Sequence, residues 1–189
     1  MSTFCAKRWA WTVAMVACAG AALAGACSSS ARVMGVRGED ARAAVPRARP
    51  ADFTLAATVL SRGSVEAKKL PRSLRPGRYI VEADGVLRAA TGPGATTTTF
   101  PGRTRQLTAE QFDSLWRDVR ESGLLDPGNP ARVDGPEAVG RVPERTTALL
   151  YAAYEGKRVT LRVPLDRSSE DAIAAERVVD RLAGLAWMR

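Results

Sequence analysis

The sequence predicts an α+β domain over residues 52–189, with an antiparallel sheet of five or six strands and two amphipathic helices packed on one face. Three observations support this prediction. First, two pairs of strand-like segments are each joined by an acidic residue followed by glycine. Second, each pair precedes a capped helix with one apolar side. Third, one more strand-like segment comes before both pairs. The shared order suggests an internal pseudo-repeat, although the halves show no residue-by-residue identity.

Residues 53–61 form the first expected strand. Phe53, Leu55, Ala57 and Val59 alternate with small or polar residues. Strict alternation of this kind is typical of a strand with one buried side. We therefore expect one side of this strand to face the core.

A first hairpin is expected from residues 78–83 and 86–90, joined by Asp84 and Gly85. Both residue types tolerate positive φ, which a two-residue hairpin turn requires. Residues 91–102 are rich in Gly, Pro and Thr, lack the lysine of a phosphate-binding loop, and are expected to form a plain loop. A short strand is expected at residues 103–106.

Residues 107–124 carry the clearest helix pattern. Thr108 is expected to cap the helix, with Gln111 as its capping-box partner and Leu107 stapled to Phe112. Gly123 fits the left-handed residue that ends many helices. The core side of the helix is expected to consist of apolar residues at helical spacing: Phe112, Leu115, Trp116 and Val119.

A second hairpin is expected within residues 146–165, with its turn at Glu155 and Gly156. This turn places Ala152 opposite Val159, Leu150 opposite Leu161, and Ala148 opposite Val163, which gives one apolar side. The other side then carries a mixed surface that is either solvated or bound to a partner: Tyr151, Arg158, Thr160 and Arg162.

The last expected helix begins at a cap formed by Ser168 or Ser169 and ends near Ala183. Leu185 and Trp187 are expected to fold back onto the core behind Gly184. The apolar stripe of this helix comprises Ala175, Val178, Val179, Leu182 and Ala186.

The N-terminus has the layout of a secretory signal peptide over residues 1–26. A short cationic segment ending in Lys7 and Arg8 precedes an apolar run rich in alanine. An uncleaved membrane helix is the alternative, but an alanine-rich run is weakly hydrophobic for that role. Residues 27–51 are polar and arginine-rich, without apolar periodicity, and are expected to form a flexible tether.

The end of this apolar run resembles the lipobox of bacterial lipoproteins. Ala24, Gly25 and Ala26 precede Cys27, which the resemblance implies is lipidated and becomes the mature N-terminus. The family usually has leucine where this chain has Ala24, and the same residues also satisfy ordinary signal peptidase. Simple secretion therefore stays open. A lipid anchor implies an exported protein on the outer side of the cytoplasmic membrane, or in the outer membrane facing the periplasm.

Composition excludes much ordinary catalysis. The chain has no histidine, and its other cysteines, Cys5 and Cys18, precede Cys27. No Ser-His or Cys-His nucleophile, His-containing zinc site or disulfide within the mature chain can then form. Ser64 and Lys68 are one residue too far apart for a Ser-x-x-Lys acyl enzyme, and the acids of residues 126–145 match no EF-hand spacing. No catalytic residue, cofactor or metal is expected.

The expected function is a non-catalytic interaction module of the cell envelope. The mature part carries 26 basic and 20 acidic residues, a net charge of +6, which favours an anionic polymer or a protein as partner, unless it reflects coding bias alone. The alternative is an enzyme acting on polysaccharide through paired carboxylates such as Glu82 or Asp84. Nucleic acid is not an expected partner, since export separates the protein from cellular nucleic acid and no aromatic-basic motif is present.

Overall fold

The computed structural model describes residues 45–61, 70–133 and 145–187 of the 189-residue chain. Several sequence predictions lie outside these residues. They are the signal peptide at 1–26, the lipidation site Cys27, the tether up to residue 44, the Ser64 and Lys68 pair, and the loop acids Asp134, Glu137 and Glu144.

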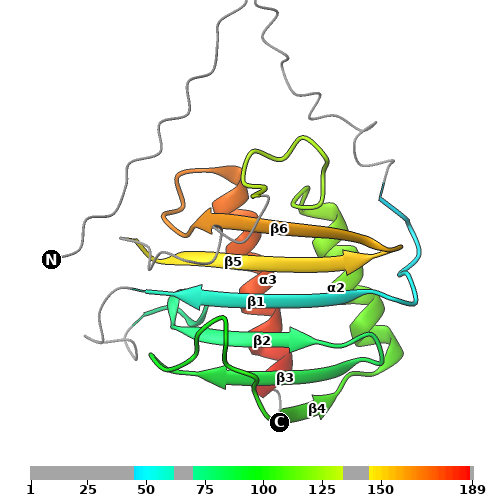
Figure 1. Ribbon diagram of the computed structural model, residues 1–189, viewed down its shortest axis with the longest axis horizontal. Helices are drawn as coiled ribbons and strands as arrows, with labels where there is room; N and C mark the ends of the chain where they lie inside the picture. The colour runs from blue at the N-terminus through cyan, green and yellow to red at the C-terminus, as the bar shows by residue number, and fades with distance from the viewer. Residues whose placement is uncertain (1–44, 62–69, 134–144, 188–189) are drawn as a thin grey trace, which may run out of the picture. The chain divides into compact units, whose positions relative to one another are not determined.

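The described strands form one antiparallel sheet in the order β4-β3-β2-β1-β5-β6 (Figure 1). The first strand along the chain, β1, lies inside the sheet, so each hairpin extends it on one side. The six strands are β1 (Thr54–Leu60), β2 (Gly77–Val81), β3 (Val86–Thr91), β4 (Arg103–Gln106), β5 (Thr147–Tyr154) and β6 (Lys157–Pro164).

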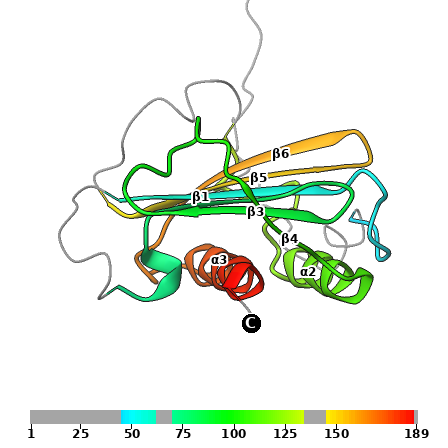
Figure 2. The same cartoon turned by 90° about the horizontal axis from the view of Figure 1, so that it is seen from below.

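Two α-helices, α2 (Ala109–Glu121) and α3 (Glu170–Trp187), lie on the same face of this sheet (Figure 2). A short 3-10 helix, η1 (Arg72–Leu74), which the sequence did not predict, packs on α3. These elements confirm the predicted α+β fold. In the described part of the chain, no helix combines the length and the hydrophobicity needed to cross a membrane.

The core lies between the sheet and the helices and contains an aromatic cluster. The Trp116 ring of α2 lies 4.7 Å from the Phe53 ring and 5.5 Å from the Tyr154 ring, centroid to centroid. Phe53 also stacks on Phe112 at 5.6 Å. Such pairs add about 0.5–1.5 kcal/mol each beyond simple burial, so the cluster fixes α2 against the start of β1 and the end of β5.

The start of α2 confirms its predicted cap. Gln111 N–H donates to Thr108 Oγ1 at 3.2 Å, and Thr108 N–H donates to Gln111 Oε1 at 3.1 Å. Gly123 follows the helix with φ +72°, as expected for the residue that ends it. Leu107 and Phe112 are both buried around this cap.

The end predicted for the last helix was wrong. Ser169 caps α3 as expected, its Oγ accepting from Ala172 N–H at 3.1 Å, but the helix continues through Gly184 to Trp187. Glycine inside a helix costs about 1 kcal/mol, whereas burying the Leu185 side chain in the next turn contributes about 1.5–3 kcal/mol. Leu185 is buried within the helix, and Trp187 is 51% exposed instead of tucked into the core.

The β5-β6 hairpin has the predicted register: Ala152 pairs with Val159, Leu150 with Leu161, and Ala148 with Val163. Its turn residues have φ +48° at Glu155 and +69° at Gly156, which is the geometry of a two-residue type I′ turn. The Asp52 carboxylate accepts hydrogen bonds from both turn N–H groups at 2.8 Å. These hydrogen bonds lower the pKa of Asp52.

The β2-β3 hairpin forms as predicted, but its turn is longer than two residues. Gly85 N–H donates to Glu82 O and Glu82 N–H donates to Val86 O, each at 2.9 Å, with φ +82° at Gly85. This is a three-residue loop with a left-handed glycine at its end. The Asp84 carboxylate accepts from Val86 N–H at 3.0 Å, so it stabilises the longer turn.

The packed chain also includes residues before the expected domain start at residue 52. Val45 is buried in the core cluster. The Arg49 Nε lies 2.7 Å from Asp113 Oδ1, and its guanidinium carbon lies 4.0 Å from the centre of the Phe112 ring. The predicted tether is therefore too long at its C-terminal end, since Val45 packs in the core and Arg49 contacts α2.

Candidate functional site on the outer face of the sheet

The face of the sheet opposite α2 and α3, called the outer face below, carries a set of side chains aligned across strands. Cross-strand partners point to the same side of a sheet, so the rows follow from the register. One row runs Arg78, Thr58, Leu149, Arg162, the next runs Arg88, Ile80, Ala56, Tyr151, Thr160, and the third runs Thr54, Ala153, Arg158. This set includes the mixed surface predicted for the second hairpin.

The charge of this face is positive. None of the described strands contains Asp or Glu. Arg88 Nε pairs with Glu82 Oε1 at 2.9 Å, just beyond the end of β2. Arg78, Arg158 and Arg162 form no ion pair with any residue in the described ranges, so their charges are available to a partner.

Arg78 is held in an unfavourable position for a cation. Its Nη1 donates to Thr58 Oγ1 at 3.0 Å, while its Nε is buried and has no hydrogen-bond partner among the described residues. Burial lowers the pKa of Arg78. A buried polar atom without a partner costs about 1–3 kcal/mol, and such atoms require an explanation beyond folding.

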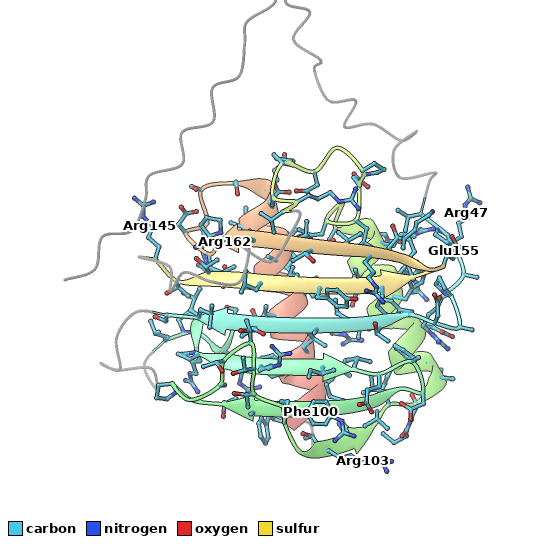
Figure 3. All side chains as sticks on the ribbon, viewed as in Figure 1. Arg47, Phe100, Arg103, Arg145, Glu155 and Arg162 are labelled. Atoms are coloured by element: carbon cyan, nitrogen blue, oxygen red, sulfur yellow. The ribbon has the colours of Figure 1, made fainter. Side chains whose placement is uncertain are left out.

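The spacing of the three arginines follows from strand geometry. Arg78 and Arg162 are three interstrand spacings apart, about 14 Å. Arg158 and Arg162 are four residues apart along β6, about 13 Å. Figure 3 shows Arg162 near the same end of the sheet as Arg145, and Glu155 at the opposite end. A guanidinium such as that of Arg158 or Arg162 can bind a carboxylate or phosphate with two parallel hydrogen bonds, whereas Arg78 has only its remaining N–H groups to offer. The triangle therefore suits repeated anionic groups.

The long β3-β4 loop, residues 92–102, rises on the outer side of the sheet (Figure 2). Thr99 Oγ1 closes it by donating to Gly94 O and accepting from Thr96 N–H, both at 3.0 Å. Phe100 is 69% exposed, and the Arg88 guanidinium lies 4.7 Å from its ring centre. The loop therefore places an aromatic ring beside the arginines of the outer face.

The edge of β6 is covered by the chain around Arg132. Val133 N–H donates to Thr160 O at 3.0 Å, and Arg162 N–H donates to Ala131 O at 2.9 Å. An edge paired in this way is not free to add another strand. A partner would therefore contact side chains of the outer face and not the backbone of β6.

The carboxylates named for an enzymatic alternative do not converge among the described residues. Glu82 pairs with Arg88, Asp84 stabilises its own turn, and Asp126 is buried at 4% exposure in the segment after α2. No group of His, Cys, Asp or Glu in the described ranges could hold a metal ion. These three carboxylates therefore do not form a pair of acids among the described residues.

Sequence reasoning missed a second set of residues on the helix side of β2. A pocket there is lined by Arg72, Arg75, Tyr79, Thr91, Ala183 and Trp187. Beside it, η1 is attached to two acids of α3, Glu176 and Asp180. One signal was present in the sequence: Glu176 falls on the same stripe of α3 as Ala172 and Val179, where a charged residue implies a buried partner.

In comparisons with known proteins, no protein-family model matches this chain, and no curated protein matches it.

Proposed function

We propose that this protein is a cell-envelope lipoprotein whose folded domain is a non-catalytic binding module for an anionic envelope polymer. One observation carries the proposal: Arg78, Arg158 and Arg162 share the outer face, and none of them pairs with a carboxylate in the described part of the chain. Exposed cationic side chains without acidic neighbours attract polyanions and steer their approach.

The geometry favours an extended partner over a single anion. The backbone positions of Arg78 and Arg158 each lie about 13–14 Å from that of Arg162, so the three side chains are spread over an area much wider than one carboxylate or phosphate. Between them lie small or half-buried side chains such as Ala56 and Thr160, with Tyr151 37% exposed. A polymer that carries an anionic group at intervals could bind all three guanidiniums while its backbone lies on this surface.

The proposed anchor is the lipid at Cys27, on the outer side of the cytoplasmic membrane or on the periplasmic side of the outer membrane. Lipid chains contribute about 0.8 kcal/mol per buried methylene, and two chains suffice for stable attachment. Cys27 precedes Val45, the first described residue, by eighteen positions, so covalent geometry limits the distance between them to about 60 Å. Polymer near the membrane surface lies within this distance.

The anchor is tested by Cys27→Ala. This variant should leave the membrane fraction and lose fatty-acid labelling, while the chain is still exported. Continued membrane attachment without labelling would show that the apolar segment at 9–26 is retained as a membrane helix, and would exclude the lipid anchor.

The binding module is tested with full-length protein in detergent and three polymers: polyphosphate, polygalacturonate and neutral dextran. The two polyanions should bind with an affinity that falls with salt, and dextran should not bind. The double variant R158Q/R162Q should weaken binding and make the plot of log affinity against log salt less steep by about two units, one for each lost contact.

The matched control is Arg117→Gln, which removes an exposed arginine of α2 on the other side of the sheet. It should change the affinity less than twofold, or about 0.4 kcal/mol. Because R117Q removes one charge and R158Q/R162Q removes two, a loss of binding free energy in R117Q half as large as that in R158Q/R162Q would show that total charge, not the outer face, determines binding. If neither polyanion binds and the domain captures an acidic protein instead, the partner is a protein and not a polymer.

A further inference from the structure

A pocket of about 360 Å³ lies on the helix side of β2, between η1, the end of β3 and the last turn of α3. Its lining consists of Arg72, Arg75, Tyr79, Thr91, Ala183 and Trp187. Tyr79 pairs with Ala57 and Ala89 across the sheet and follows Arg78, so the two side chains point to opposite sides of β2. The pocket and the outer face are therefore separate surfaces.

The pocket is cationic. Arg72 and Arg75 line it from η1 and its C-terminal cap, and no carboxylate is among the lining residues. Arg72 forms no ion pair with any residue of the described segments. Two acids of α3 lie beside the pocket: Glu176 accepts from Ser73 Oγ at 3.1 Å, and Asp180 interacts electrostatically with Arg72 and Tyr79.

Two aromatic residues complete the pocket. Burial, and secondarily the charge of Asp180, raises the pKa of Tyr79, so its hydroxyl stays protonated and can donate a hydrogen bond. Trp187 lines the same pocket as Tyr79 and is 51% exposed. A half-exposed indole ring therefore forms part of the pocket wall.

The backbone is shaped to admit the Tyr79 hydroxyl. A Cβ atom at Gly77 would lie 3.3 Å from the Tyr79 hydroxyl oxygen and 3.3 Å from Ala90 O. Any side chain at residue 77 would therefore crowd the phenol. Glycine at this position leaves the hydroxyl free to line the pocket.

We propose that this pocket binds a small anionic saccharide: one sugar ring that carries a carboxylate or a phosphate. Arg72 binds the anionic group, the ring packs on the Trp187 indole, and Tyr79 and Thr91 hydrogen-bond the sugar hydroxyls. The volume lies within the range of about 300–1,000 Å³ that is usual for small-molecule sites. The inference goes beyond the proposed polymer binding, because the two surfaces share no residue.

The test uses full-length protein in detergent, labelled with 5-fluorotryptophan, and follows its fluorine NMR signals. The Trp187 signal is identified by its loss in Trp187→Phe, and the signal of the buried Trp116 reports on folding. Glucuronate and glucose 6-phosphate are titrated, with glucose and inorganic phosphate as controls. Trigalacturonate is titrated as well, to distinguish the two possible sources of the bound anionic sugar: the end of an acidic polysaccharide and a free sugar acid.

Glucuronate or glucose 6-phosphate should shift the Trp187 signal and leave that of Trp116 in place, with glucose and phosphate each binding at least about tenfold more weakly. Arg72→Gln should weaken binding about tenfold, and Arg117→Gln should not. The proposal fails if no sugar shifts Trp187, if phosphate alone binds as well as glucose 6-phosphate, or if Arg72→Gln has no effect. None of these results depends on polymer binding by Arg158 and Arg162.

Discussion

Ser73 Oγ donates a hydrogen bond to Glu176 Oε1 at 3.1 Å and joins η1 to the middle of α3, 103 residues later in the chain. The same carboxylate accepts from Arg167, whose Nε lies 2.9 Å from Oε2. Ser73 is fully buried, and Arg72 and Arg75, which precede and follow it within two residues, line the cationic pocket. Glu176 therefore fixes the position of η1 and, through it, of Arg72.

Replacing Glu176 by Gln should lower the free energy of unfolding by about 1.5–3 kcal/mol at pH 7, the range for a hydrogen bond to a charged group. The Arg167 hydrogen bonds are the main cause that lowers the pKa of Glu176. A carboxyl group whose pKa is lower in the folded than in the unfolded state stabilises the fold at pH values above its unfolded-state pKa. This stabilisation is lost as the pH falls through the folded-state pKa. The difference in the free energy of unfolding between the variant and the wild type should therefore be smallest at low pH.

Urea unfolding at pH 7 and pH 3 measures this difference. Asp180 acts in the opposite direction: burial, and secondarily the charge of Glu176, raises its pKa, so its protonation favours the folded state. Glu176→Gln removes the second of these causes, so this opposing contribution is smaller in the variant. Glu121→Gln is the control, because Glu121 is 59% exposed and lies 3.6 Å from its neighbour Arg120. An equal loss of stability at both pH values would show that the charge of Glu176 contributes nothing.

Thr108→Ala should cost about 1 kcal/mol of stability, because it removes the side chain that accepts from Gln111 N–H at the start of α2. Thr108→Ser keeps the hydroxyl and should recover most of the loss. Both values come from urea unfolding. If serine were as destabilising as alanine, the contribution of Thr108 would come from its methyl group and not from the cap.

Gly156→Ala should cost about 1–2 kcal/mol, because an L-residue with φ near +69° is strained. The site isolates this backbone effect, since no atom lies within 4 Å of the added Cβ. Gly128→Ala is the matched control: its surroundings are equally open, and its φ is not in the left-handed region. Thermal unfolding should separate the two variants, and equal melting temperatures would contradict the type I′ turn.

The parts of the fold that the sequence predicted correctly depend on contacts between residues close in the chain. The capping box joins Thr108 to Gln111, and the β5-β6 register follows from its two-residue turn. The helix end was misjudged because of packing: Gly184 stays helical because Leu185 is buried beyond it. The length of the first turn was misjudged for a local reason, since the Asp84 carboxylate accepts from Val86 N–H and stabilises a longer turn than its neighbour Gly85 suggested.

The candidate sites divide in the same way. Tyr151, Arg158 and Arg162 were predicted to share one side of the second hairpin. Side chains alternate between the two sides of a strand, and the position of the turn then determines which residues of the two strands share a side. The addition of Arg78 from β2 required the strand order, which places β1 between the hairpins. The pocket could not be predicted, since Arg72 and Trp187 lie near opposite ends of the domain sequence and meet only through the packing of η1 on α3.

Arg78 provides a test of whether the outer face is maintained for binding at the expense of stability. Its buried Nε has no partner among the described residues, and its Nη1 donates to Thr58, which is 2% exposed. Replacing both hydrogen-bond partners by apolar residues of similar shape is often neutral or stabilising. The double variant R78M/T58V should therefore unfold with a free energy equal to the wild type or up to about 1 kcal/mol higher.

Thr58→Val alone should instead destabilise the domain by about 1–3 kcal/mol, because it removes the hydrogen-bond partner of Arg78 Nη1 while Nε is already buried without one. Polygalacturonate binding by R78M/T58V should weaken despite the retained stability, since one of the three unpaired guanidiniums is gone. Urea unfolding and the polymer titration are made on the same samples. A double variant that is less stable yet binds as well as the wild type would assign Arg78 to the fold and remove it from the proposed binding surface.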